Sequence, residues 1–164
     1  MEEGITVHAA VRNPENEAKV GHLTNAATNA KGTLKFFKAD LLTQGAYKDA
    51  MEGCELVFHT ASPFITDVKD AQKELIEPAL NGTKNVLETA KEVASVKRVV
   101  LTSSVAAMYS DAIDTLNAPK GMLTEDVWNT TASLEYQPYS FSKTLAEKKA
   151  WEIAESQNQW DLVV

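Results

Sequence analysis

The sequence predicts an α/β fold built on a doubly wound parallel sheet, with helices on both faces. Short runs rich in β-branched and aromatic residues alternate with longer stretches at helical spacing, and this alternation is typical of parallel strands joined by crossover helices. The run at 97–103, centred on Val99-Val100-Leu101, has the continuous apolar character of a strand buried on both faces.

The first third of the chain contains three expected strands, at 5–12, 34–38 and 55–60. Pro14 suits the first turn of a helix that runs to about Leu23. A second, short helix is expected at 44–51, and Gly53 ends it.

In the rest of the chain, a long helical segment is expected from Val68 to Val93, and Pro78 must kink or restart it. The stretch 104–137 is expected to be irregular, with a short helical turn at 124–128. A helix at 138–156 and a strand that begins at 161 complete the pattern.

Composition bounds the size and the partners of the protein. The chain has 164 residues, of which 44% are hydrophobic, and this suits one domain over 1–164. The net charge of −7 argues against a nucleic-acid partner, because proteins that bind phosphate backbones concentrate Lys and Arg. A small molecule is the expected partner, and the oligomeric state stays open.

Cysteine and histidine usage predicts a reducing compartment and no metal site. Cys54 is the single cysteine, which excludes an intramolecular disulfide, and His8, His22 and His59 lack metal-ligand spacing. No apolar run reaches the roughly 20 residues of a membrane span, and the first four residues are acidic where a signal peptide is basic. We expect a cytoplasmic protein without a membrane partner.

The strongest chemical signal is Tyr139-Ser140-Phe141-Ser142-Lys143. A spacing of four residues puts the phenol and the ammonium on one helix face. A neighbouring cation stabilises the phenolate form of a tyrosine, so such a pair can deliver a proton to a carbonyl oxygen. The alternative is an ordinary solvated surface pair.

Two serines, Ser103 and Ser104, follow the apolar strand. Ligands of open α/β sheets bind beyond the carboxyl ends of the strands, where a hydroxyl can hydrogen-bond a developing oxyanion. The alternative is that these hydroxyls only satisfy backbone groups. Together with Tyr139 and Lys143, they lead us to expect a Ser-Tyr-Lys set that converges at this edge of the sheet.

Seven ordered segments make the chain resemble the extended short-chain dehydrogenases/reductases, in the branch of plant dihydroflavonol and cinnamoyl-CoA reductases and fungal ketone reductases. The resemblance covers nearly the whole chain. The segments are Val11-Arg12-Asn13-Pro14, Ala39-Asp40-Leu41, Phe58-His59-Thr60-Ala61-Ser62-Pro63-Phe64, Pro78-Ala79-Leu80-Asn81-Gly82-Thr83, Arg98-Val99-Val100-Leu101-Thr102-Ser103-Ser104, Glu125-Asp126-Val127-Trp128, and Tyr139-Ser140-Phe141-Ser142-Lys143-Thr144-Leu145-Ala146-Glu147.

The resemblance implies a Rossmann-type fold and assigns roles to single residues. It makes Ser104 the catalytic serine, with Ser103 as the second choice. It makes Tyr139 the acid and Lys143 its partner, which also binds the nicotinamide ribose. The further cofactor contacts that it implies are Asp40 and Leu41 at the adenine, and Thr60, Ala61 and Ser62 along the cofactor cleft.

The end of the strand at 5–12 indicates NADPH rather than NADH. A carboxylate there holds the ribose hydroxyls of NAD, whereas an arginine accommodates the extra phosphate of NADP. This strand ends in Arg12 without a carboxylate beside it, and the resemblance adds Lys19 as a second phosphate contact. The nearby carboxylates of Glu15 and Glu17 favour the alternative, in which Arg12 and Lys19 are ordinary exposed cations.

One expected element is absent from the sequence. This fold needs a first strand and a G-x-G-x-x-G-type turn for the pyrophosphate, and no such glycine cluster occurs; Glu2-Glu3-Gly4 has the pattern of a helix end. In the usual order 3-2-1-4-5-6 the strands at Val7 and Val57 would lack their shared neighbour. We expect an incomplete sheet, unless it is rearranged or completed by another chain, and a substrate region mostly beyond Val164.

The predicted function is NADPH-dependent reduction of a ketone or aldehyde to an alcohol. One alternative is a nucleotide-sugar epimerase or dehydratase of the same superfamily, against which the Val11–Pro14 and His59–Phe64 matches argue. Another is a non-catalytic NADP-binding protein, which would leave the Ser-Tyr-Lys set unexplained. A third is a fragment that is inactive by itself.

Overall fold

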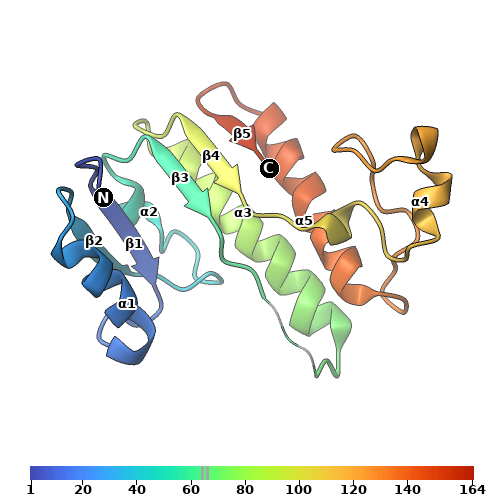
Figure 1. Ribbon diagram of the computed structural model, residues 1–164, viewed down its shortest axis with the longest axis horizontal. Helices are drawn as coiled ribbons and strands as arrows, with labels where there is room; N and C mark the ends of the chain where they lie inside the picture. The colour runs from blue at the N-terminus through green and yellow to red at the C-terminus, as the bar shows by residue number, and fades with distance from the viewer. Residues whose placement is uncertain (64, 66) are drawn as a thin grey trace.

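The strands form two small parallel sheets. The computed structural model describes residues 1–63, 65 and 67–164. In it, β1 (Val7–Val11) pairs with β2 (Leu34–Lys38), and β3 (Leu56–His59), β4 (Arg98–Leu101) and β5 (Asp161–Val163) form a second sheet in that order. Among the described residues no ladder joins β1 to β3 (Figure 1). The expectation that these two strands lack a shared neighbour is confirmed.

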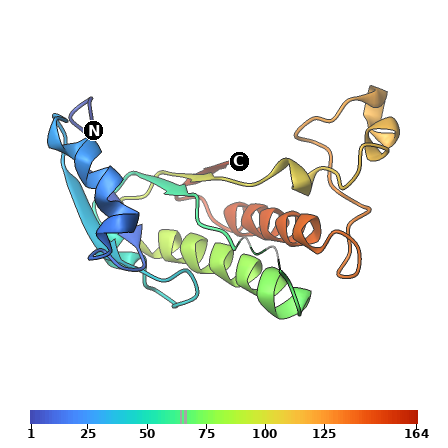
Figure 2. The same ribbon diagram turned by 60° about the horizontal axis from the view of Figure 1, so that its bottom comes forward.

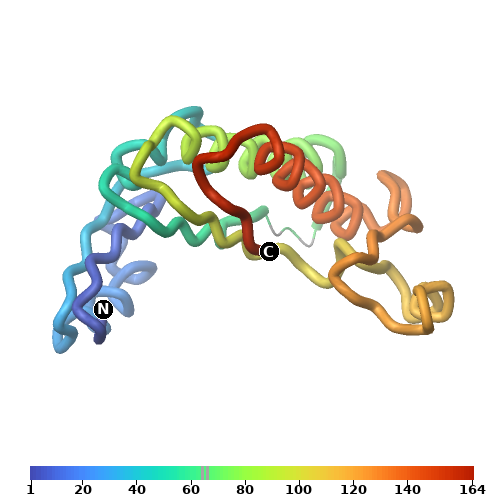
Figure 3. The backbone as a smooth tube through the Cα atoms, turned by 90° about the horizontal axis from the view of Figure 1, so that it is seen from above, coloured from blue at the N-terminus to red at the C-terminus, as the bar shows by residue number. Residues whose placement is uncertain are grey.

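Helices connect successive strands and lie on both sides of them. The helices that lie against the strands are α1 (Glu17–Thr28), α2 (Lys48–Met51), a π-helical turn (Gln72–Ile76), α3 (Glu77–Glu92) and α5 (Pro138–Glu155). In Figures 1 and 3, α1 lies on one side of the strands, whereas α2, α3 and α5 lie on the other. The doubly wound α/β fold is confirmed in a partial form.

The main core lies between the second sheet and the pair α3 and α5, which run side by side beneath it (Figure 2). On β4, Val99 and Leu101 are buried, whereas Arg98 is exposed and Val100 is only partly buried, because alternate residues of a strand point to opposite faces. The expectation that this strand is buried on both faces is therefore wrong. The cluster consists of Met51, Val86, Leu87, Ala90, Val93, Val96, Val99, Leu101, Ala150, Ile153 and Trp160.

Proline marks the start of two of these helices. Pro78 lies in the first turn of α3, directly after the π-helical turn, and Pro138 begins α5. The fixed φ of proline suits a first turn, where its missing N–H costs no hydrogen bond. The helix was expected to kink or restart at Pro78; instead it continues from the π-helical turn into α3 without a break, since Ile76 and Glu77 both keep helical dihedrals.

Three of the local expectations are wrong. The first helix continues past Leu23 to Thr28, because no glycine or proline lies between these two residues. The second helix does not begin at Gln44, since Gly45 takes a φ of 71° that a right-handed helix excludes. At the start of the chain, residues 2–4 form a turn and bend instead of a helix end.

The irregular segment also differs from its expectation. Residues 124–128 contain a single turn, closed by Val127 N donating to Thr124 O, and no helix. Helical structure forms instead at Val105–Ala107, at α4 (Asp114–Asn117) and at Pro119–Gly121. The carboxylate of Asp114 accepts the N–H groups of the preceding turn, which the sequence pattern did not predict. No helix in the described residues is long and apolar enough to cross a membrane.

Candidate active site

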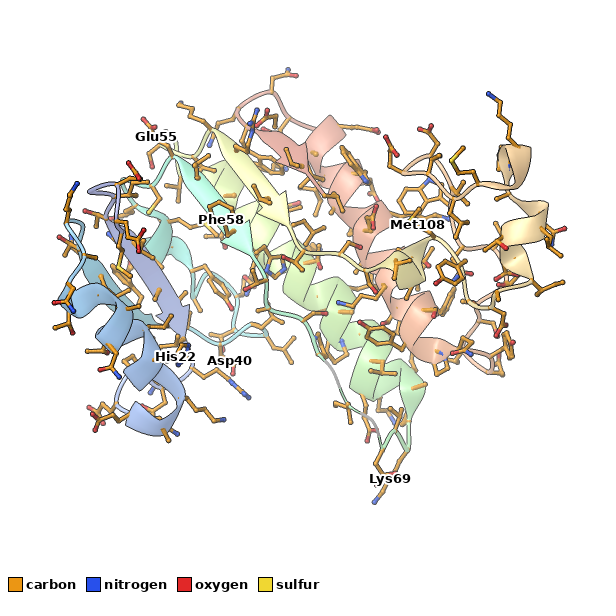
Figure 4. All side chains as sticks on the ribbon, in the orientation of Figure 1. His22, Asp40, Glu55, Phe58, Lys69 and Met108 are labelled. Carbon is orange, nitrogen blue, oxygen red and sulfur yellow. The ribbon has the colours of Figure 1, made fainter. Side chains whose placement is uncertain are left out.

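The predicted site segments follow the carboxyl ends of the strands. Arg12 directly follows β1, Thr60 directly follows β3, and both serines lie beyond Leu101, the last residue of β4. Figure 4 labels Glu55 at the amino end of β3 and Asp40 and Met108 on the opposite side of the strands. This side is where parallel α/β sheets bind ligands.

Lys143 is the most constrained charged group of this region. The residue is 7% exposed, and its Nζ donates to Ser62 Oγ at 2.6 Å. The same Nζ lies 5.6 Å from the centroid of the Tyr139 ring, within reach of a cation–π attraction. Burial lowers the pKa of Lys143. Tyr139 and Lys143 therefore do not form an ordinary solvated surface pair.

The start of α5 fixes where this pair lies. Gln137 takes a left-handed conformation, with φ of 54°, and Pro138 follows it. Ser140, Ser142 and Thr144 are buried, and the hydroxyls of the last two donate to carbonyls of the same helix. Because all three side chains are small and the hydroxyls of Ser142 and Thr144 are satisfied within the helix, this polar first half of α5 packs inside the protein.

The two serines after β4 make different contacts. Ser103 Oγ donates to Glu147 of α5, whereas Ser104 Oγ accepts the N–H of Ala106 at 3.2 Å and caps the turn Val105–Ala107. That turn packs against α5. The structure thus brings the segment that follows Ser104 to the helix that carries Tyr139 and Lys143.

Asn129 organises the irregular segment, and sequence reasoning missed this role. It is 6% exposed; its backbone N–H donates to Ala107 O at 2.8 Å, and its Nδ2 donates to Ala106 O at 2.9 Å. Its Oδ1 accepts the N–H of Thr131 and Ala132. The only sequence signal was an Asn two residues before a Thr, a pattern typical of local Asx turns.

His59 lies at the end of β3 and is 5% exposed. Its pKa is lowered from 6.5 to about 4, first by burial and second by the positive charge of Lys143. His59 therefore packs at the end of its strand. At neutral pH it is an uncharged neighbour of the buried ammonium.

We expect the free energy of unfolding to decrease as the pH falls from about 6.5 to about 4. In this window the unfolded chain binds a proton at residue 59 and the folded protein does not, so acid favours unfolding. At about 1.36 kcal/mol per pKa unit, the full effect is about 3 kcal/mol. Urea titrations across this pH range measure it.

His59→Gln should reduce this pH dependence, because glutamine does not titrate. His22→Gln is the matched control, since His22 is exposed on α1, and it should leave the dependence unchanged. The same slope in wild type and His59→Gln would show that another group controls acid stability.

The predicted cofactor residues of the first sheet face solvent. Arg12, Lys19 and Asp40 are exposed, and Asp40 Oδ1 accepts the N–H of Leu42 at 3.0 Å, which shapes the loop after β2. An exposed guanidinium at one strand end and exposed hydroxyls at another, Thr60 and Ser62, are groups that suit phosphate and ribose. These residues fit NADPH. Phe64 of the same predicted segment lies outside the described residues.

Leu41 is half-buried and packs directly against α3. Asn85 of α3 holds its loop: Nδ2 donates to Leu41 O at 3.0 Å and to Thr43 O at 2.8 Å, and Oδ1 accepts Gly45 N at 3.0 Å. A Cβ at Gly82 would lie 2.6 Å from Leu41 Cγ. The glycine therefore allows the loop after β2 to approach the helix.

Gly82→Ala should destabilise the protein by about 1–3 kcal/mol, the usual effect of overpacking. Gly21→Ala in α1 is the control, because a Cβ there meets Glu17 at an ordinary 3.5 Å and alanine is the better helix former. Urea denaturation compares the two variants. Equal or higher stability of Gly82→Ala would show that Leu41 does not need this space.

Within the described part of the chain, no three His, Cys, Asp or Glu residues gather as metal ligands. The parallel strands with helices on both sides form a partial Rossmann-type fold, the fold of the short-chain dehydrogenases/reductases. The chain matches the model of the NAD dependent epimerase/dehydratase family over residues 1–164 and belongs to this family.

Sequence relatives of the chain carry reductase names. Cinnamoyl-CoA reductase CAD2 of Medicago truncatula is 45% identical over 161 residues, which cover 96% of this chain and 48% of that protein. Anthocyanidin reductase of Arabidopsis thaliana is 39% identical, over 99% of this chain and 48% of that protein. The chain spans about half the length of these relatives.

Solved structures of reductases have the same fold. Yeast methylglyoxal/isovaleraldehyde reductase Gre2, complexed with NADPH, superposes with a TM-score of 0.74 at 31% identity, covering 95% of this chain and 48% of that one. Gre2 of Candida albicans in complex with NADPH gives a TM-score of 0.77 at 33% identity, with the same coverage of 95% and 48%.

Proposed function

We propose that the protein reduces a ketone or aldehyde to an alcohol with NADPH, using Ser104, Tyr139 and Lys143. The observation that carries the proposal is the buried ammonium of Lys143, held between the Tyr139 ring and Ser62 at the carboxyl edge of the sheet. Burial of a cation costs free energy, so a function for this charge explains why it lies there.

Tyr139 is the proposed proton donor. Reduction of a carbonyl places negative charge on its oxygen, and a phenol can protonate that oxygen as the charge develops. The positive charge of Lys143 stabilises the phenolate that remains. Lys143 thus acts on the phenol as well as on the cofactor ribose.

Ser104 is the proposed oxyanion donor. Its Oγ uses a lone pair to accept the Ala106 N–H, so the hydroxyl hydrogen remains for a substrate oxygen. A fixed donor aimed at developing charge is worth several kcal/mol in a water-poor site. The cap on Val105–Ala107 keeps the oxygen in place.

Bound NADPH would supply the hydride that the carbonyl carbon accepts. Arg12 and Lys19 would hold the extra phosphate and Asp40 and Leu41 the adenine, and Thr60, Ala61 and Ser62 would line the cofactor cleft. The Gre2 structures with NADPH support this cofactor for a chain of the same fold.

Reduction is favoured over epimerisation by the names of the sequence relatives. Several proteins 37% to 45% identical to the chain are reductases by name. The family model covers epimerases and dehydratases as well, so the two activities need a direct comparison.

The test is NADPH oxidation by the purified full-length protein with two substrate panels, aromatic and aliphatic carbonyl compounds and nucleotide sugars. We expect stoichiometric oxidation with at least one carbonyl compound and none with nucleotide sugars. Conversion of a nucleotide sugar without net NADPH oxidation, together with inertness toward carbonyl compounds, would overturn the proposal.

A further inference from the structure

The helix α5 presents a third functional side chain in line with Tyr139 and Lys143. Glu147 follows Lys143 by the same spacing of four, and each such step advances about 6 Å along the axis while turning only slightly. The three side chains therefore lie along one side of the helix. Two of them contact residues just beyond different strands, Lys143 at Ser62 after β3 and Glu147 at Ser103 after β4.

The contact between Ser103 and Glu147 connects the segment that carries Ser104 to α5, the helix that carries Tyr139 and Lys143. Ser103 Oγ donates to Glu147 Oε2 across 44 residues of sequence, and both side chains are partly buried. A carboxylate acceptor makes a hydrogen bond stronger than a neutral acceptor does, and partial burial limits competition from water. The bond thus joins the neighbour of Ser104 to the helix of Tyr139 and Lys143.

Ser104 cannot make the same contact as its neighbour. Its backbone is extended, with φ of −156° and ψ of 145°, and adjacent side chains of extended chain point to opposite sides. Its Oγ caps Val105–Ala107 instead. The hydroxyl of Ser103 donates to a helix carboxylate, whereas the hydroxyl of Ser104 donates to no acceptor among the described residues.

We propose that Glu147 is a positioning residue of the active site, which holds Ser104 in register with Tyr139 through the hydroxyl of Ser103. The inference rests on the proposed reductase function. It also divides the serine pair: Ser103 anchors the strand end and Ser104 contacts the substrate oxygen. A displacement of about 1 Å at such a site can lower turnover as much as about 100-fold.

The test uses Ser103→Ala, Glu147→Gln and the double variant in the full-length protein, with turnover, KM for a carbonyl substrate and NADPH affinity by fluorescence titration. We expect each single variant to lower kcat about 10-fold with NADPH affinity within about twofold, a smaller loss than full misplacement gives. The double variant should lose no more than Ser103→Ala alone, because Ser103→Ala removes this contact and Glu147→Gln weakens the same contact by taking away the charge of its acceptor.

Two further variants make the result specific. Ser103→Thr keeps the hydroxyl and should retain kcat within about threefold of wild type. Glu152→Gln removes an exposed carboxylate of α5 that is ion-paired to Lys149, and this variant should behave as wild type. Additive losses in the double variant, or unchanged kcat in both single variants, would overturn the proposal. If the wild-type protein did not bind NADPH, that result would overturn the proposed reductase function and not only the role of Glu147.

Discussion

Tyr139→Phe is expected to lower turnover of the full-length enzyme by about 100-fold or more, the usual contribution of general acid catalysis. Phenylalanine keeps the ring that lies 5.6 Å from Lys143 Nζ and removes the hydroxyl group that carries the transferable proton. The affinity for NADPH should therefore stay nearly unchanged. Steady-state kinetics and a cofactor titration on the same preparations measure both quantities.

Tyr136→Phe is the matched control for this substitution. Tyr136 is 49% exposed, and its hydroxyl donates to Asp111 in the irregular segment. Its loss should leave turnover within about threefold, as for a surface substitution. Near-wild-type turnover of Tyr139→Phe would exclude Tyr139 from the role of acid.

Arg12→Ala is expected to weaken NADPH binding far more than NADH binding. A guanidinium at the end of β1 can grip the ribose phosphate of NADPH through charge-assisted bonds that NADH cannot make. If each bond contributes about 1.5–3 kcal/mol, the preference for NADPH should fall about 10-fold to 150-fold. Lys19 would reduce this loss if it took over part of the contact.

Arg98→Ala is the control for charge alone. Arg98 begins β4 at the amino edge of the sheet, where it is ion-paired to Asp161. Its removal should change the binding of neither cofactor by more than about twofold, because screening weakens charges that lie more than about 10 Å away. Equal losses of NADPH and NADH affinity in Arg12→Ala would show that Arg12 does not recognise the phosphate.

Local pattern was sufficient to predict most of the fold. The strand around Val99 and Leu101 follows from its continuous apolar character, and the helix at 138–156 agrees with α5 to within one residue. The separation of β1 from β3 followed from the missing glycine-rich turn and the usual strand order. Each of these signals lies in a short stretch of sequence.

Contacts between distant segments left no such signal. Ser62 and Lys143 are 81 residues apart, and only the folded chain shows that their side chains meet. The side chain of Asn129 hydrogen-bonds backbone groups of two segments, at Ala106 and at Ala132. Glu147 joins α5 to the residues that follow β4. Periodicity predicts which face of an element is buried, but it does not predict which hydroxyl binds which charge.

Transfer of the isotope label from deuterated NADPH tests the central claim most directly. If the protein is a carbonyl reductase, the cofactor labelled at the reactive position of its nicotinamide should yield an alcohol with one deuterium on the carbinol carbon for each NADPH consumed, measured by mass spectrometry. An unlabelled product formed without consumption of NADPH would contradict the account and indicate epimerase chemistry instead.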